Sequence, residues 1–66
     1  MEERQEIRKL ARALKARGVD KDSGVIISLQ VRKDGKRDRL LQWMADNPEA
    51  TPSEIMEKAR LLHRER

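Results

Sequence analysis

The segment Val25-Ile26-Ile27-Ser28-Leu29-Gln30-Val31-Arg32 decides the fold class. Apolar and polar residues alternate over most of it, which is the period of a β-strand, and its β-branched residues favour the same structure. One face of this strand would carry Val25, Ile27, Leu29 and Val31, and the other Ile26, Ser28, Gln30 and Arg32. The segment therefore predicts a strand with one apolar face.

This strand has no partner within its own chain. The following residues, Lys33-Asp34-Gly35-Lys36, are typical of a turn, but the sequence beyond them does not alternate as the second strand of a hairpin would. The apolar residues there cluster instead at helical spacings, at Leu40, Leu41, Trp43, Met44 and Ala45. A lone strand with an apolar face pairs most simply with the same strand of a second molecule, so we expect a homodimer.

An amphipathic helix is predicted from Glu2 to Arg17. Its apolar residues recur at helical spacing, at Ile7, Leu10, Ala11 and Leu14. Gly18 follows where helices commonly end in the left-handed conformation. The polar segment 19–24 (VDKDSG) has no periodicity and is interpreted as a connector.

Two further helices are predicted after the turn. The first spans residues 36 to 46 or 47 and stops before Pro48. The second has clear start signals, with Thr51 as N-cap, Pro52 at the first helical position and Glu54 placed to close a capping box. The expected order is helix, strand, helix, helix. It divides into an N-terminal helix (1–18), a connector (19–24) and a domain containing the strand and two helices (25–66).

The composition limits the class of protein. The chain has 66 residues, no cysteine, one histidine, 36% hydrophobic residues and a single aromatic residue, Trp43, so a self-sufficient monomeric core is not expected. Its net charge of +4 favours polyanionic partners. No nucleophile motif, phosphate loop or metal-ligand spacing occurs, which indicates a protein that is not an enzyme and needs no metal, cofactor or small-molecule substrate. No apolar run suits a membrane span or signal peptide, so we expect a cytoplasmic location and no membrane partner.

One strand followed by two helices, from Gly24 to about Arg64, resembles the ribbon-helix-helix family of phage and plasmid repressors. The resemblance implies a mainly α fold with one strand per chain, in an intertwined homodimer whose two strands form an antiparallel ribbon. That ribbon would enter the major groove of double-stranded DNA. It also implies a transcriptional repressor, an autoregulator or another plasmid or phage regulatory protein, and a DNA phosphate seated at the start of the last helix.

Three groups of site residues follow. Base contacts are expected from the polar strand face at Ser28, Gln30 and Arg32, because these side chains offer the groups that base edges bind. Phosphate contacts are expected from the basic residues after the strand and from the start of the last helix, at Lys33, Lys36, Arg37, Arg39, Ser53 and Glu54. The dimer core is expected from Val25, Ile27, Leu29, Val31, Leu40, Leu41, Trp43, Met44, Ile55, Ala59 and Leu62.

Other interpretations of the same residues stay open. The polar face of any half-exposed strand can be a solvated surface that binds nothing. The stretch from Arg37 to Leu62 also resembles the start of a helix-turn-helix or winged-helix unit, which would bind DNA through a helix. A third alternative is a structural or interaction dimer, natural or engineered, that does not bind DNA.

Overall fold

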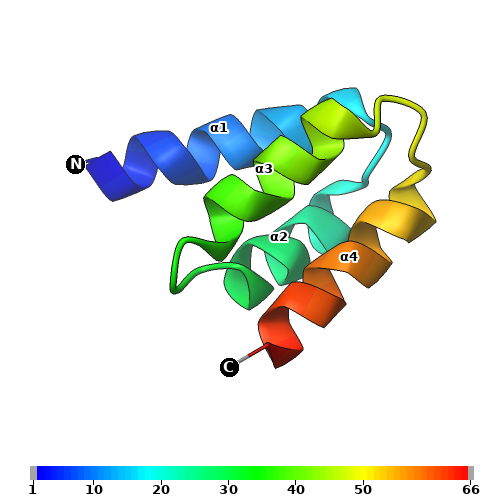
Figure 1. Cartoon of the computed structure of the whole chain (residues 1–66). Helices are drawn as coiled ribbons and strands as arrows, with labels where there is room; N and C mark the ends of the chain where they lie inside the picture. The colour runs from blue at the N-terminus through cyan, green and yellow to red at the C-terminus, as the bar shows by residue number, and fades with distance from the viewer. Residues whose placement is uncertain (1, 66) are drawn as a thin grey trace.

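The computed structural model describes the backbone of residues 2–65 and the side chains of residues 8–65, and four α-helices make up its regular structure (Figure 1). They are α1 (Glu2–Ala16), α2 (Lys21–Gln30), α3 (Lys36–Asp46) and α4 (Pro52–Arg64). No strand occurs among the described residues. The expected ribbon-helix-helix fold, with one strand per chain and a ribbon shared between two chains, is therefore wrong.

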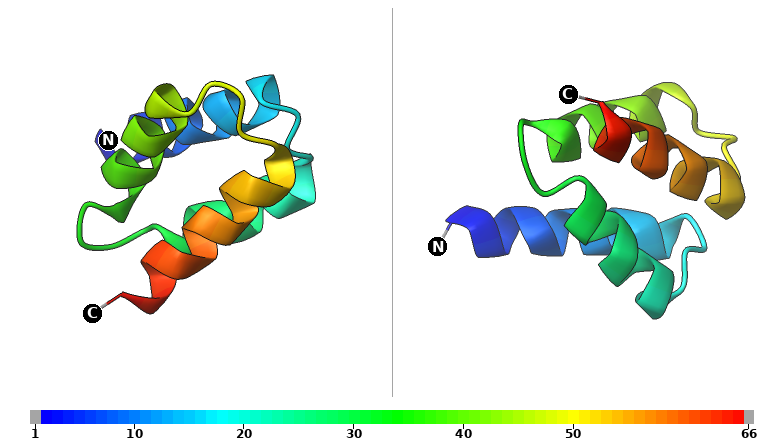
Figure 2. Two further views of the ribbon diagram at one scale, coloured as in Figure 1. Left: turned by 45° about the vertical axis from the view of Figure 1, so that its right-hand side comes forward. Right: turned by 90° about the horizontal axis from the view of Figure 1, so that it is seen from below.

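Each helix packs against two neighbours, in the order α1, α2, α4, α3 around the molecule (Figures 1 and 2). The connectors between consecutive helices are short, so the chain folds back on itself at residues 17–20, 31–35 and 47–51. The resulting body measures 30 by 25 by 22 Å. The apolar faces of all four helices can meet in one centre because the helices close into a ring.

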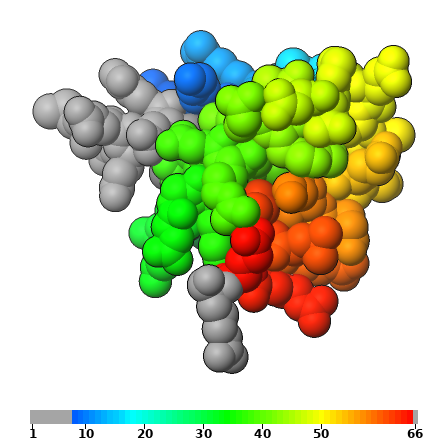
Figure 3. Space-filling view, in the orientation of Figure 1, coloured from blue at the N-terminus to red at the C-terminus, as the bar shows by residue number. Residues whose placement is uncertain are grey.

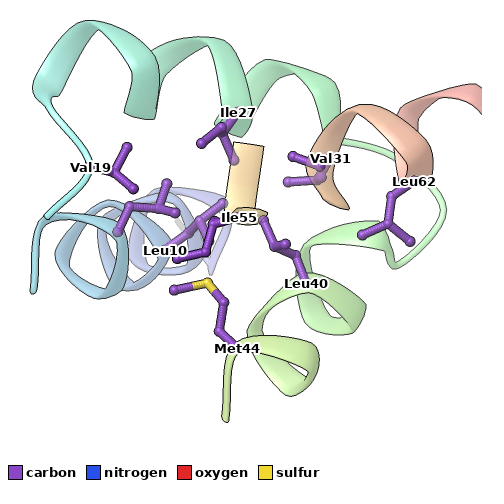
Figure 4. Close-up of a cluster of buried hydrophobic side chains, with 10 residues drawn as sticks. Leu10, Val19, Ile27, Val31, Leu40, Met44, Ile55 and Leu62 are labelled. Atoms are coloured by element: carbon purple, nitrogen blue, oxygen red, sulfur yellow. The ribbon is translucent and has the colours of Figure 1, made fainter. Parts of the chain in front are cut away.

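The core lies inside a single chain. Its buried apolar side chains are Leu10, Leu14, Val19, Ile27, Val31, Leu40, Met44, Ile55, Ala59 and Leu62. Figure 4 shows Ile55 in the middle of this cluster, surrounded by side chains from the other helices. The sequence predicted a homodimer because the strand needed a partner and because the composition did not indicate a self-sufficient monomeric core. Both reasons disappear when the four helices cover one another.

The segment that was expected to form the strand is most of α2. Asp20 begins this helix as its N-cap, and its carboxylate accepts a hydrogen bond from the Ser23 amide at 3.2 Å. Ile27 and Val31 lie one helical turn apart and are buried, whereas Val25 and Leu29 fall on the opposite side and are exposed. The alternation of apolar residues along residues 25–31 therefore does not correspond to one buried face.

The division of the chain also differs from expectation. Residues 21–24, interpreted as part of a connector, form the first turn of α2, and the actual connector is residues 17–20. α1 packs against both α2 and α3, and its Leu10 and Leu14 belong to the common core. Ile7, the other large apolar residue of the expected stripe, lies outside the side chains that the structure describes. The N-terminal helix is thus part of the single folded unit.

The expectations for α1, α3 and α4 are confirmed. α1 ends at Ala16, and Gly18 takes the left-handed conformation with φ +85°. α3 ends at Asp46, before Pro48. At the start of α4 the capping box is formed, because the Thr51 amide donates to Glu54 Oε1 at 3.0 Å and the Glu54 amide donates to Thr51 Oγ1 at 3.2 Å.

Replacing Gly24 by alanine tests the helical assignment of α2. We expect the free energy of unfolding to rise by about 0.5–1 kcal/mol, because alanine favours a helix interior over glycine. The added Cβ would meet Leu14 Cδ1 at 3.9 Å, an ordinary contact. The measurement is urea denaturation followed by far-UV circular dichroism. Gly35→Ala, at φ +69°, is the matched control and should destabilise. A loss of stability in Gly24→Ala would contradict the helix.

Candidate functional site

The three residues expected to contact bases do not share a face. Ser28 and Arg32 lie beside the space between α1 and α2, and the Ser28 hydroxyl donates to the Gly24 carbonyl oxygen at 2.8 Å. Gln30 does not line this space, because it lies two residues after Ser28 in the helix and so on roughly the opposite side of it. Its backbone carbonyl oxygen lies 3.2 Å from His63 Nδ1 of α4. The expected trio depended on the period of a strand, and the helical twist separates its members.

The basic residues after α2 have different surroundings. Lys36 is buried, and its Nζ donates to the carbonyl oxygens of Glu65 at 2.9 Å and His63 at 3.3 Å, which caps the end of α4. Arg39 pairs with the Glu65 carboxylate at 3.0 Å. Figure 3 shows the end of α4 against the start of α3, where these bonds form. Arg37 is also buried. Lys33 is the one of these four residues that is both exposed and without an ion-pair partner among the described residues.

The start of α4, expected to hold a phosphate, is closed by its own side chains. The Glu54 carboxylate accepts the hydrogen bond from the Thr51 amide. This bond, and a smaller contribution from the Thr51 hydroxyl, lower the pKa of the Glu54 carboxyl. A negative charge therefore stands beside the amide groups of the first turn, next to the exposed Ser53. The Glu54 carboxylate would repel an incoming phosphate, which would have to displace it to reach these amide groups.

The residues expected to form a dimer core fall into three groups. Seven are buried within the chain: Ile27, Val31, Leu40, Met44, Ile55, Ala59 and Leu62. Leu41 and Trp43 are half-buried against the cluster. Val25 and Leu29 are 53% and 60% exposed, together with their neighbour Ile26 at 54%. These three side chains form an exposed aliphatic surface on α2, which we call the α2 aliphatic patch.

A broad open groove lies between α1 and α2, on the side of the molecule where the connector 17–20 joins them. Figure 2 (right) shows how the two helices cross at an angle after this connector. Ala11, Leu14 and Gly18 contribute from α1 and its end. Val25 and Leu29 contribute from α2, one helical turn apart. The groove thus has an apolar floor that includes two of the three residues of the α2 aliphatic patch.

Cations surround this groove. Lys15 lies on the α1 side, Lys21 at the start of α2, and Arg32 and Lys33 just beyond its end. Asp20 is the acidic residue among the side chains that line the groove, and hydrogen bonds from the side chain and amide of Ser23 lower the pKa of its carboxyl. The groove therefore combines an aliphatic floor with a rim that carries an excess of positive charge.

This arrangement suits noncovalent recognition of a macromolecule. Contiguous exposed aliphatic side chains on a small protein commonly mark an interaction surface. Among the described residues no group of three or more histidine, cysteine, aspartate or glutamate side chains could hold a metal ion. No described helix is long and apolar enough to cross a membrane.

Sequence reasoning missed both α2 and the groove. A signal for the helix was present, because aspartate is a favourable N-cap residue and Asp20 stands directly before the helix. The groove itself has no local signal, since it depends on the angle at which α1 and α2 diverge.

Comparison of the chain with models of protein families, with curated proteins and with solved structures found no match.

Proposed function

We propose that this chain is a noncatalytic binding module that takes an α-helix of a partner protein into the groove between α1 and α2. The α2 aliphatic patch is the observation that carries the proposal. Val25, Ile26 and Leu29 are more than half exposed, although the same chain buries a complete core elsewhere. Covering the patch would remove apolar surface from water, which is the main source of affinity in such interfaces.

A helix fits this groove better than an extended peptide. The groove is bounded by two helices, and Val25 and Leu29, one helical turn apart, are the part of its apolar floor that α2 contributes. Amphipathic helices dock in such grooves through apolar residues at matching spacings of three, four and seven. An extended peptide usually adds to a sheet edge, and the described residues contain no strand.

Duplex DNA binding is the second candidate, and the distribution of charge favours it. Residues 8–37 contain ten lysine or arginine residues and three aspartates, so this half of the chain is strongly basic. A four-residue connector joins α1 and α2, with Gly18 in the left-handed conformation, as helix-turn-helix units often have. However, the exposed face of α2 offers aliphatic groups and few base-reading groups.

The experiment is selection of binders from a displayed library of helical peptides, followed by affinity measurements on Leu29→Ser. Loss of this contact should weaken the selected peptides by about 10- to 100-fold, the equivalent of one buried leucine. Leu61→Ser is the matched control, because Leu61 is exposed to a similar extent on α4, outside the groove. Failure to select any helical peptide that depends on Leu29 would contradict the proposal.

The same proteins distinguish the second candidate. Fluorescence anisotropy with a labelled duplex would show salt-sensitive binding that Leu29→Ser leaves unchanged, because phosphate contacts do not use the aliphatic patch. Such DNA binding, without any peptide binding, would favour DNA binding as the function of the chain in place of helix binding.

A further inference from the structure

The charge at the rim of the groove determines which kind of helix can bind there. The four exposed rim cations, Lys15, Lys21, Arg32 and Lys33, have no ion-pair partner among the described residues. Two cations outside the groove are ion-paired, Arg39 with Glu65 and Arg60 with Glu57, whereas Lys9, Arg12, Lys58 and Arg64 have no ion-pair partner among the described residues either. The rim therefore presents positive charge that the chain does not neutralise.

The acidic residue of the rim does not change this balance. The Asp20 carboxylate caps α2 through the Ser23 amide, so it already faces the positive end of that helix. A partner approaching the groove meets cations on the α1 side at Lys15 and at both ends of α2. Complementary potentials favour a negatively charged partner.

From these observations we infer that the partner of the groove is an acidic amphipathic helix, an inference that rests on the proposed function. Its apolar face covers Val25 and Leu29, and glutamate or aspartate side chains on its two flanks meet Lys15 on one side and Arg32 with Lys33 on the other. The aliphatic contacts supply most of the affinity, because exposed ion pairs contribute little individually. The charges select which helix binds and accelerate its association.

A second copy of this chain is a poorer occupant. Two copies each carry a net charge of +4 and would bring like charges together at the groove. The exposed face of α4, which is the other amphipathic surface, carries Arg60 and Arg64 as well as Glu57. Duplex DNA is negatively charged, but its phosphates gain nothing from covering Val25 and Leu29.

Two synthetic helical peptides test the inference. They share leucines at helical spacing and differ only on their flanks, which carry glutamate in one and lysine in the other. At low salt the protein should bind the glutamate peptide about tenfold more tightly than the lysine peptide, and high salt should reduce this difference. The double variant Lys15→Glu with Arg32→Glu should reverse the preference. The matched control, Lys9→Glu with Arg64→Glu, changes exposed charges outside the groove and should keep it.

Each result has a distinct meaning. Equal binding of both peptides, abolished by Leu29→Ser, would overturn the acidic partner and leave the proposed function standing. Binding of neither peptide would overturn both. Concentration-dependent dimerisation in sedimentation, abolished by Leu29→Ser, would replace the partner helix by a second copy. Circular dichroism shows whether the double charge reversal disturbs folding. If it does, Lys15→Gln and Arg32→Gln are tested singly, and each should reduce the preference for the glutamate peptide. An unchanged preference would overturn the inference.

Discussion

Replacing Ile55 by alanine is expected to lower the free energy of unfolding by about 4 kcal/mol. Ile55 is 0% exposed and lies in the middle of the cluster drawn in Figure 4, among side chains from the other helices. The loss combines the transfer of the removed methyl and methylene groups with the cavity that they leave. A domain of this size is stable by roughly 3–10 kcal/mol, so the variant should be largely or partly unfolded at room temperature.

Thermal and urea denaturation, followed by circular dichroism, measure this effect. Leu61→Ala is the control on the same helix, because Leu61 is 49% exposed, and its stability should stay within about 0.5 kcal/mol of the original. The denaturation midpoint of the unaltered protein should not depend on protein concentration, since the core lies within one chain. Similar losses in the two variants, or a midpoint that rises with concentration, would contradict this core.

Three of the four helices could be predicted because their signals are local. In α1 and α3 the apolar residues recur at the helical spacings of three and four, and each helix ends two residues before a glycine or a proline. In α4 the start is encoded by Thr51, Pro52 and Glu54, which form a cap with their own backbone. Such interactions do not require knowledge of the rest of the fold.

α2 could not be assigned in the same way because its aliphatic residues occupy more than one face. Ile27 and Val31 are buried, but Val25, Ile26 and Leu29 are exposed, so the helical period is hidden. The same residues are β-branched or large and alternate with polar ones, which favours a strand locally. Packing of Ile27 and Val31 against the other helices outweighs that preference.

The expected base-contacting site depended on the strand, which the structure does not contain among its described residues. Ser28, Gln30 and Arg32 share a face only if the side chains alternate as in a strand. In the structure Ser28 and Arg32 line the groove and Gln30 does not. The exposure of Val25 and Leu29, which carries the proposed function, is a tertiary property. It follows from which face of α2 the core occupies, and a single segment does not reveal that.

A second large effect is expected at Arg17, where replacement by methionine should lower the free energy of unfolding by about 2 kcal/mol. The Arg17 guanidinium donates to the carbonyl oxygens of Met44 at 2.9 Å, Asn47 at 2.5 Å and Ala50 at 3.4 Å. It therefore ties the end of α1 to the end of α3 and to the connector 47–51. The carbonyl groups at the end of a helix carry partial negative charge and need donors.

The loss at Arg17 should be smaller than three separate charged hydrogen bonds would suggest, because the site is only half-buried and water can reach the freed carbonyl groups. Arg17→Lys keeps the charge but cannot span three oxygens, so it should restore less than half of the loss. Arg12→Met, at an exposed position of α1, is the matched control. Besides the denaturation midpoint, amide hydrogen exchange should accelerate most at residues 47–51, where the bonds are removed. A uniform acceleration over the whole described chain would instead mean that Arg17 contributes only to global stability and does not hold this connector.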